Sequence, residues 1–187
     1  MIGGRDSEPE DQALSAALVQ TVRVRPVEIP LAQPVELATG TLRTTPVVLI
    51  DLRTSDGVCG HSYLRSHSAL ALRGLATLID ELAGRLVGRP ATPAALERAV
   101  PSPLRLLGMR GLVGAALAGL DMALWDARAQ AAAEPLARLL GSDVDRVPAY
   151  ATIRARDPGR AGEEAQGGRG GRVRGGQAQA RGSVGCR

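Results

Sequence analysis

The sequence has no lysine and no phenylalanine, and aromatic residues make up only 2% of its 187 residues. A core must therefore be built from Leu, Val, Ile and Ala, whose small side chains call for close packing of the backbone. Without lysine the chain also has no side-chain amine that could act as a catalytic base. The composition predicts one small globular core followed by a tail.

Long apolar runs are missing as well. No run approaches the roughly 20 apolar residues of a membrane span, and the N-terminus carries charges of both signs without an apolar signal segment. These absences predict a cytoplasmic protein with no membrane partner. The formal net charge of +4 arises in the last stretch rather than in the body, so a nucleic-acid partner is not expected.

The front of the chain has β-type patterning. Residues 1–18 are polar and acidic before a short apolar patch, and we expect them to be flexible. Three β-rich runs follow at 19–29, 47–52 and 58–64, and Asp56-Gly57 between the last two is typical of a hairpin. Prolines and a glycine between 30 and 46 predict a surface loop.

After Ser66 the apolar residues recur at helical spacing up to Gly88. Thr92-Pro93 predicts the N-cap and first turn of a short helix through residue 99. A longer helix is expected over 106–132, with Leu112 among its core-facing residues, and a short one over 135–140. Three glycines inside the long helix predict close packing against a neighbouring backbone.

Residues 116–141 carry the most specific pattern. Its constrained positions are Ala116-Leu117-Ala118-Gly119-Leu120-Asp121, Ala123-Leu124-Trp125-Asp126-Ala127, Ala129-Gln130, Pro135-Leu136 and Leu139-Leu140-Gly141. This mixture of small, acidic, apolar and Gly positions resembles the mandelate racemase and muconate lactonizing enzyme family of the enolase superfamily. Upstream segments such as Ala38-Thr39-Gly40-Thr41 and Gly60-His61-Ser62-Tyr63-Leu64 extend the resemblance to residues 20–166.

The resemblance implies an α+β fold, an enolase N-terminal-like cap in which a three-stranded antiparallel meander is followed by a helical bundle. We expect a flexible N-terminus over 1–18, the capping domain over 19–146, a remnant of the first barrel strand and helix over 147–166, and a disordered Gly/Arg-rich tail over 167–187. The family's C-terminal (β/α) barrel is expected to be absent.

In this family the barrel holds Mg²⁺, a Lys-x-Lys pair and a His-Asp base, and the cap supplies no catalytic residue and no metal ligand. The parent reaction is Mg²⁺-dependent abstraction of the proton α to a carboxylate, in racemization or dehydration of a hydroxy acid. We therefore expect this truncated chain to bind no Mg²⁺, to be inactive alone, and to self-associate through an exposed apolar face.

The resemblance also implies which cap residues approach the substrate. Val35 and Leu42 fall where the first cap loop of the family contacts substrate. Arg65 and His67 fall where the mandelate racemases of the family carry aromatic side chains. An Arg and a His at these positions favour a polar or anionic substrate over a phenyl ring.

Other polar residues are expected to be structural. His61 has no second His or carboxylate at ligand spacing, which favours a packed or surface histidine over a metal ligand. Asp121 and Asp126 are five residues apart on one helix, so they point to different faces, and we expect them to fix helix ends or pair with Arg. Ser62 lacks the Gly-x-Ser-x-Gly setting of a hydrolase nucleophile.

The tail admits two further interpretations. Arg169-Gly170-Gly171 and Arg174-Gly175-Gly176 resemble RGG segments, so an RGG-tailed RNA-binding or protein-interaction module is the alternative function. Codon degeneracy suggests instead that the tail is out of frame. A one-base shift turns Gln177 and Gln179, each followed by Ala, into Lys or Arg codons and permits the family's Lys-x-Lys strand.

Overall fold

The computed structural model describes residues 17–37, 40–66, 68–144 and 146–147. Described residues up to Gly141 belong to one compact unit, and Ser142 begins a second one. The predictions for residues 1–16, for nearly all of the barrel remnant and for the tail, including its RGG and frame interpretations, lie outside the described residues. The sheet and the helices belong to the first unit.

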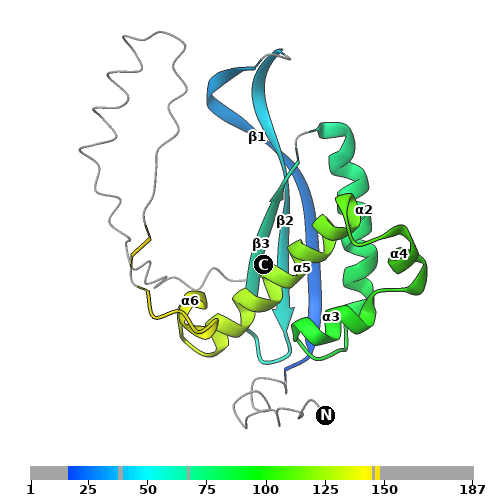
Figure 1. Ribbon diagram of the computed structural model, residues 1–187, viewed down its shortest axis with the longest axis vertical. Helices are drawn as coiled ribbons and strands as arrows, with labels where there is room; N and C mark the ends of the chain where they lie inside the picture. Colours follow the sequence, from blue (N-terminus) through cyan, green and yellow to red (C-terminus); the bar gives the residue numbers. More distant parts are fainter. Residues whose placement is uncertain (1–16, 38–39, 67, 145, 148–187) are drawn as a thin grey trace, which may run out of the picture. The chain divides into compact units, whose positions relative to one another are not determined.

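The first unit contains a three-stranded antiparallel sheet in the order β1-β2-β3 (Figure 1). Its strands are β1 (Val19–Leu37), β2 (Gly40–Thr54) and β3 (Cys59–Arg65). Gly57 in the β2–β3 turn has φ +90°, a conformation that glycine adopts readily and that the Asp-Gly pair predicts. The predicted meander is confirmed.

The prediction of a surface loop over 30–46 is wrong. β1 continues to Leu37 and β2 begins at Gly40, so the two strands form one long hairpin with a register shift between Pro30 and Val35. Pro30 and Pro34 are tolerated because β1 is an edge strand, where a missing N–H on the solvent side breaks no ladder hydrogen bond, and Pro46 of β2 lies beyond the pairing of β2 with β3. β3 pairs with β2 only from Val47 to Arg53, so the far half of the hairpin is two-stranded.

The helices are α2 (Ala69–Leu86), α3 (Pro93–Ala99), α4 (Ser102–Leu107), α5 (Gly111–Ala131) and α6 (Leu136–Leu139). Thr92 caps α3 as expected, because its Oγ1 accepts the Ala95 N–H at 3.2 Å. Ser68 caps α2 by accepting the Leu70 N–H at 3.2 Å. Within the described residues, no helix is both long and apolar enough to cross a membrane.

The prediction of one helix over 106–132 is wrong at its start. α4 ends at Leu107 and α5 begins at Gly111, and the positive φ values of Gly108 (+90°) and Gly111 (+62°) separate the two helices. Leu112 is 48% exposed rather than turned to the core. Close packing against a backbone explains Gly114, whose added Cβ would meet the Met109 carbonyl oxygen at 2.5 Å. At Gly119 the added Cβ would meet the Ile50 side chain at 2.7 Å, and Gly111 has open space around it.

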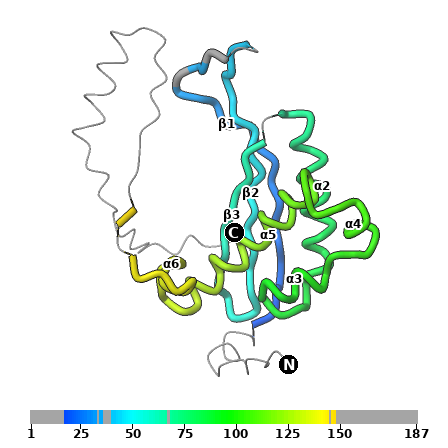
Figure 2. Tube along the Cα trace, in the orientation of Figure 1, coloured from blue at the N-terminus to red at the C-terminus, as the bar shows by residue number. Residues whose placement is uncertain are grey.

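Helices α2 and α5 cover one face of the sheet side by side, α2 over β1 and α5 over β3 (Figures 1 and 2). The core between these layers is aliphatic, as the composition predicts. Its fully buried side chains include Val48, Ile50 and Leu52 of β2, Ile79, Leu82 and Leu86 of α2, and Leu120 and Leu124 of α5. Because the buried residues of β2 alternate, the residues between them lie on the opposite, open face of the sheet.

Candidate functional site

The β1–β2 hairpin carries two of the four residues expected near substrate. Val35 and Leu42 are directly opposite each other in the strand register, and both side chains are partly buried. They lie in the part of the hairpin that extends beyond the end of β3. Figure 2 shows this hairpin reaching past the helices at one end of the sheet. The structure thus brings Val35 and Leu42 together as one apolar pair on a projecting element.

Arg65 lies at the root of the same hairpin, as the last residue of β3. Its side chain is exposed, its backbone pairs with Val47, and its Nε donates to Thr45 Oγ1 at 3.1 Å. Val47 is five residues along β2 from Leu42, about 17 Å at the rise of a β-strand. Arg65 and the apolar pair therefore line one end of the sheet without touching.

The segment that follows Arg65 is tied to β2 and to α2. The Ser66 N–H donates to the Pro46 carbonyl at 2.9 Å, and the buried Ser66 Oγ donates to the Ser68 carbonyl at 2.8 Å. These bonds fix the backbone immediately after Arg65. His67, the fourth expected residue, lies outside the described residues.

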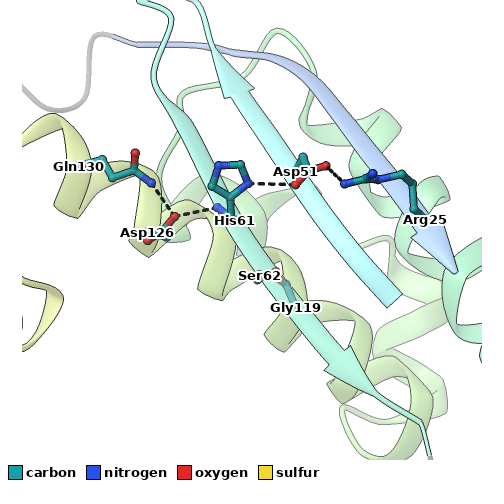
Figure 3. Close-up of polar contacts among 7 residues, drawn as sticks. All are labelled: Arg25, Asp51, His61, Ser62, Gly119, Asp126 and Gln130. Carbon is teal, nitrogen blue, oxygen red and sulfur yellow. Dashed lines mark hydrogen bonds and ion pairs between the residues drawn. The ribbon is translucent and has the colours of Figure 1, made fainter. Parts of the chain in front are cut away.

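A polar row crosses the open face of the sheet, and sequence reasoning missed it (Figure 3). Arg25 Nη2 lies 2.6 Å from Asp51 Oδ2, and His61 Nδ1 lies 2.9 Å from Asp51 Oδ1. Partial burial raises the pKa of Asp51, but the hydrogen bond with His61 and the charge of Arg25 outweigh burial, so the net pKa is below 3.8. The available signal was the alternation within β2, which places Asp51 between the buried Ile50 and Leu52 and therefore on the opposite face of the sheet.

The polar contacts behind this row join β3 to α5 (Figure 3). Asp126 Oδ2 accepts the backbone N–H of His61 at 2.7 Å and the Gln130 Nε2 at 2.8 Å, and Ser62 Oγ donates to the Gly119 carbonyl at 2.6 Å. Each of these polar groups has a protein partner, in line with the structural roles expected for them. The expectation that Asp126 fixes a helix end or pairs with Arg is wrong, because its partners are a strand amide and a glutamine.

Asp121 lies on another side of α5, in an open groove of about 830 Å³ formed with α3 and α4. Partial burial raises the pKa of Asp121, and the nearby Glu97 carboxylate raises it further. Arg105 also lines the groove, but its Nη2 donates to the Glu97 carbonyl at 2.7 Å and is held at the end of α3.

The described residues do not fit a magnesium site. They contain no group of three or more His, Cys, Asp and Glu side chains that could hold a metal ion. The Glu97–Asp121 pair supplies two carboxylates, whereas Mg²⁺ sites need an octahedral set of oxygens. No chemical step through a metal ion is therefore derived from this part of the chain.

The fold and the long hairpin define an α+β capping domain of the enolase type. The sequence profile described as mandelate racemase / muconate lactonizing enzyme, N-terminal domain, matches residues 19–141. The chain belongs to this family, which confirms the resemblance and the fold expected from it.

Two characterised relatives share this region. The L-talarate/galactarate dehydratase of Salmonella typhimurium is 29% identical over 143 residues, which cover 72% of this chain and 35% of the relative. The L-Lys-D/L-Arg epimerase of Methylococcus capsulatus is 31% identical over 140 residues, covering 72% of this chain and 38% of the relative. The chain thus spans little more than a third of the length of these relatives.

Solved structures are also similar to this chain in sequence and fold over part of their length. An enolase from Bradyrhizobium, complexed with magnesium and mandelic acid, is 42% identical with a TM-score of 0.66, over 72% of this chain and 37% of that one. The L-talarate dehydratase of Polaromonas sp. JS666, complexed with Mg and L-glucarate, is 27% identical with a TM-score of 0.75, over 83% of this chain and 44% of that one.

Proposed function

We propose that this chain is the N-terminal substrate-capping domain of an Mg²⁺-dependent enzyme that abstracts the proton α to a carboxylate, in racemization or dehydration of a hydroxy acid. The observation that carries the proposal is the family match over residues 19–141 together with the projecting β1–β2 hairpin. A hairpin of this kind, closed over a reaction site, excludes water and shapes the pocket.

The proposed substrate contacts come from the family resemblance, and the geometry around Val35, Leu42 and Arg65 supports them. Val35 and Leu42 offer a small apolar surface, and Arg65 offers a guanidinium at the hairpin root that Thr45 orients. A guanidinium binds a carboxylate through two parallel hydrogen bonds. We therefore propose an anionic or polar substrate tail for Arg65 and His67, rather than a phenyl ring. The Polaromonas dehydratase in complex with L-glucarate supports a polar substrate, whereas the Bradyrhizobium enolase, at 42% identity, is complexed with mandelic acid, which carries a carboxylate and a phenyl ring.

We propose that catalysis depends on a base and on metal ligands that this chain does not supply. The sequence has no lysine, and the described residues offer no three-ligand metal site. Enolisation needs a base for the α-proton and a cation for the developing negative charge. In the intact family enzyme Mg²⁺ provides that cation. The 187-residue chain is accordingly proposed to be inactive alone, and its cytoplasmic location stays a prediction.

The experiment is a solvent-exchange assay on the purified chain. Incubation in D₂O with Mg²⁺ and a panel of 2-hydroxy acids, followed by proton NMR of the α-position, is expected to give no exchange above the protein-free control. Exchange that depends on both Mg²⁺ and the chain would overturn the proposal, because it would place base and metal ligands within these 187 residues.

A further inference from the structure

Positive charge is concentrated on the open face of the sheet. Where all three strands pair, this face consists of four cross-strand rows with one residue from each strand. The rows are Thr21, Arg53 and Cys59; Arg23, Asp51 and His61; Arg25, Leu49 and Tyr63; and Val27, Val47 and Arg65. Each row contains one arginine, and all four arginines are exposed. The described face thus has a formal charge of +3 with its histidine neutral, from four arginines and one aspartate.

The charge of the domain as a whole conceals this patch. Acidic residues such as Asp80 of α2 and Asp121 of α5 lie on the two helices that cover the opposite face of the sheet. The expectation of no nucleic-acid partner is based on the charge of the whole body, which averages over both sides of the sheet. Guanidinium groups on adjacent strands of one face repel each other, so an anionic partner would stabilise this face.

An exposed aromatic ring lies among these charges. Tyr63 is 67% exposed, and it pairs with Leu49 across the strands. On β3 it lies between His61 and Arg65, which are two residues away on either side and therefore share its face. A nucleic-acid base can stack on such a ring while neighbouring guanidinium groups bind phosphates. An acidic protein segment would use the arginines but would not need the ring, so the arrangement favours nucleic acid.

We propose that the open face of the sheet binds single-stranded RNA, with a base stacked on Tyr63 and phosphates bound by the arginines of the four rows. The rows span about 20 Å along the strands, which is room for several nucleotides. The planar guanidinium group binds phosphate through two parallel hydrogen bonds. In a duplex the bases stack on each other, so only a single strand offers a free base to the ring. The proposal does not depend on the capping role.

The first test measures how the full 187-residue chain binds a fluorescein-labelled single-stranded RNA of about 20 nucleotides, by fluorescence anisotropy at several salt concentrations. Arg53→Glu should lower the affinity at least about fivefold. It should also make the slope of log K against log salt shallower by about 0.7, because one phosphate contact is lost. Arg73→Glu is the matched control, since Arg73 is an exposed arginine of α2, and it should change the affinity by less than about twofold.

The second test separates stacking from charge. Tyr63→Ala should lower the affinity at least about fivefold and leave the salt slope unchanged, because it removes a ring and no charge. Tyr63→Phe keeps the ring and should bind within about twofold of the wild-type chain. Both side chains replaced in the two tests are exposed, and far-UV circular dichroism checks that each variant is folded.

Three results would overturn the proposal. The first is a wild-type chain that does not bind the RNA even at low salt. The second is binding that Arg53→Glu lowers no more than Arg73→Glu does, or that Tyr63→Ala leaves unchanged, since the RNA would then contact another part of the chain. The third is displacement of the RNA by poly-L-glutamate as readily as by unlabelled RNA, which would indicate an acidic protein segment as the partner.

Discussion

The carboxylate of Asp126 accepts the backbone N–H of His61 at 2.7 Å, although 65 positions separate the two residues in the sequence. β3 is an edge strand of the sheet, and an edge N–H without a partner is a template for pairing with another chain. Asp126 satisfies this donor and at the same time anchors α5 to β3. Asp126, one of the two acidic residues of the family motif, therefore has a structural role here.

Two substitutions of Asp126 distinguish the contribution of its hydrogen bonds to stability from the contribution of its charge. Asp126→Ala removes the acceptor and should lower the free energy of unfolding by about 1–3 kcal/mol. Asp126→Asn keeps a carbonyl oxygen at the same position and should lose less. Urea unfolding followed by circular dichroism measures both. Equal losses for the two variants would show that charge, rather than the acceptor, holds the strand.

Gly60 allows α5 to approach β3 closely enough for this contact. An added Cβ would lie 2.0 Å from the Ala123 carbonyl oxygen and 2.8 Å from the Ala127 nitrogen, both backbone atoms that cannot move aside cheaply. Gly60→Ala should therefore destabilise the domain by about 1–3 kcal/mol or more.

Gly74 is the matched control for Gly60. It lies inside α2, and an added Cβ there would meet nothing within 4 Å. Gly74→Ala should raise the free energy of unfolding by roughly 0.5–1 kcal/mol, because alanine has the higher helix propensity. Two alanine variants with the same effect in urea unfolding would contradict the proposed contact between β3 and α5.

We expect Asp51 to make an acid-sensitive contribution to the free energy of unfolding. Its pKa is held below 3.8 in the folded protein, since the hydrogen bond with His61 and the charge of Arg25 outweigh burial. The stabilisation is present above the unfolded-state pKa and is lost as the pH falls through the folded-state pKa. Asp51→Asn should be less stable than wild type near neutral pH, and the difference should shrink below pH 3.8. A difference independent of pH would contradict the ion-pair account.

We expect the contribution of Asp121 to the free energy of unfolding to change with pH in the opposite direction. Burial and the neighbouring Glu97 raise its pKa, so ionisation of Asp121 destabilises the folded state as the pH rises above 3.8. Asp121→Asn should stabilise the domain at neutral pH and have no effect at a pH well below 3.8. Thermal unfolding at several pH values measures this, and a loss of stability at neutral pH would show that the carboxylate has a favourable partner.

The local features of the fold were predictable from the sequence. The Asp-Gly turn, the Thr92 cap and the meander all follow from nearby residues, and the structure confirms them. The extended hairpin was not predictable in this way, because prolines interrupt most strands. Pro30 and Pro34 are tolerated here since β1 lies at an edge of the sheet, and Pro46 lies in β2 beyond its pairing with β3. The break between α4 and α5 depends on the positive φ of Gly108, which marks a helix end that the apolar spacing alone does not reveal.

The candidate site was predictable only in part. Val35 and Leu42 are assigned by family resemblance, and their direct pairing depends on a strand register that local patterning does not determine. The Arg25–Asp51–His61 row joins three strands, and the Asp126–His61 bond joins a strand to a distant helix. Contacts of this kind depend on tertiary packing, which the local pattern of a single sequence does not specify.

The most direct test of the capping role is a chimera in which residues 19–141 replace the matching N-terminal region of the Salmonella typhimurium L-talarate/galactarate dehydratase. The measurement is Mg²⁺-dependent exchange of the α-proton of hydroxy acids. The capping account predicts activity, with Arg65→Ala lowering kcat/KM for dicarboxylates more than for monocarboxylates. A folded chimera that exchanges no α-proton on any hydroxy acid would contradict it.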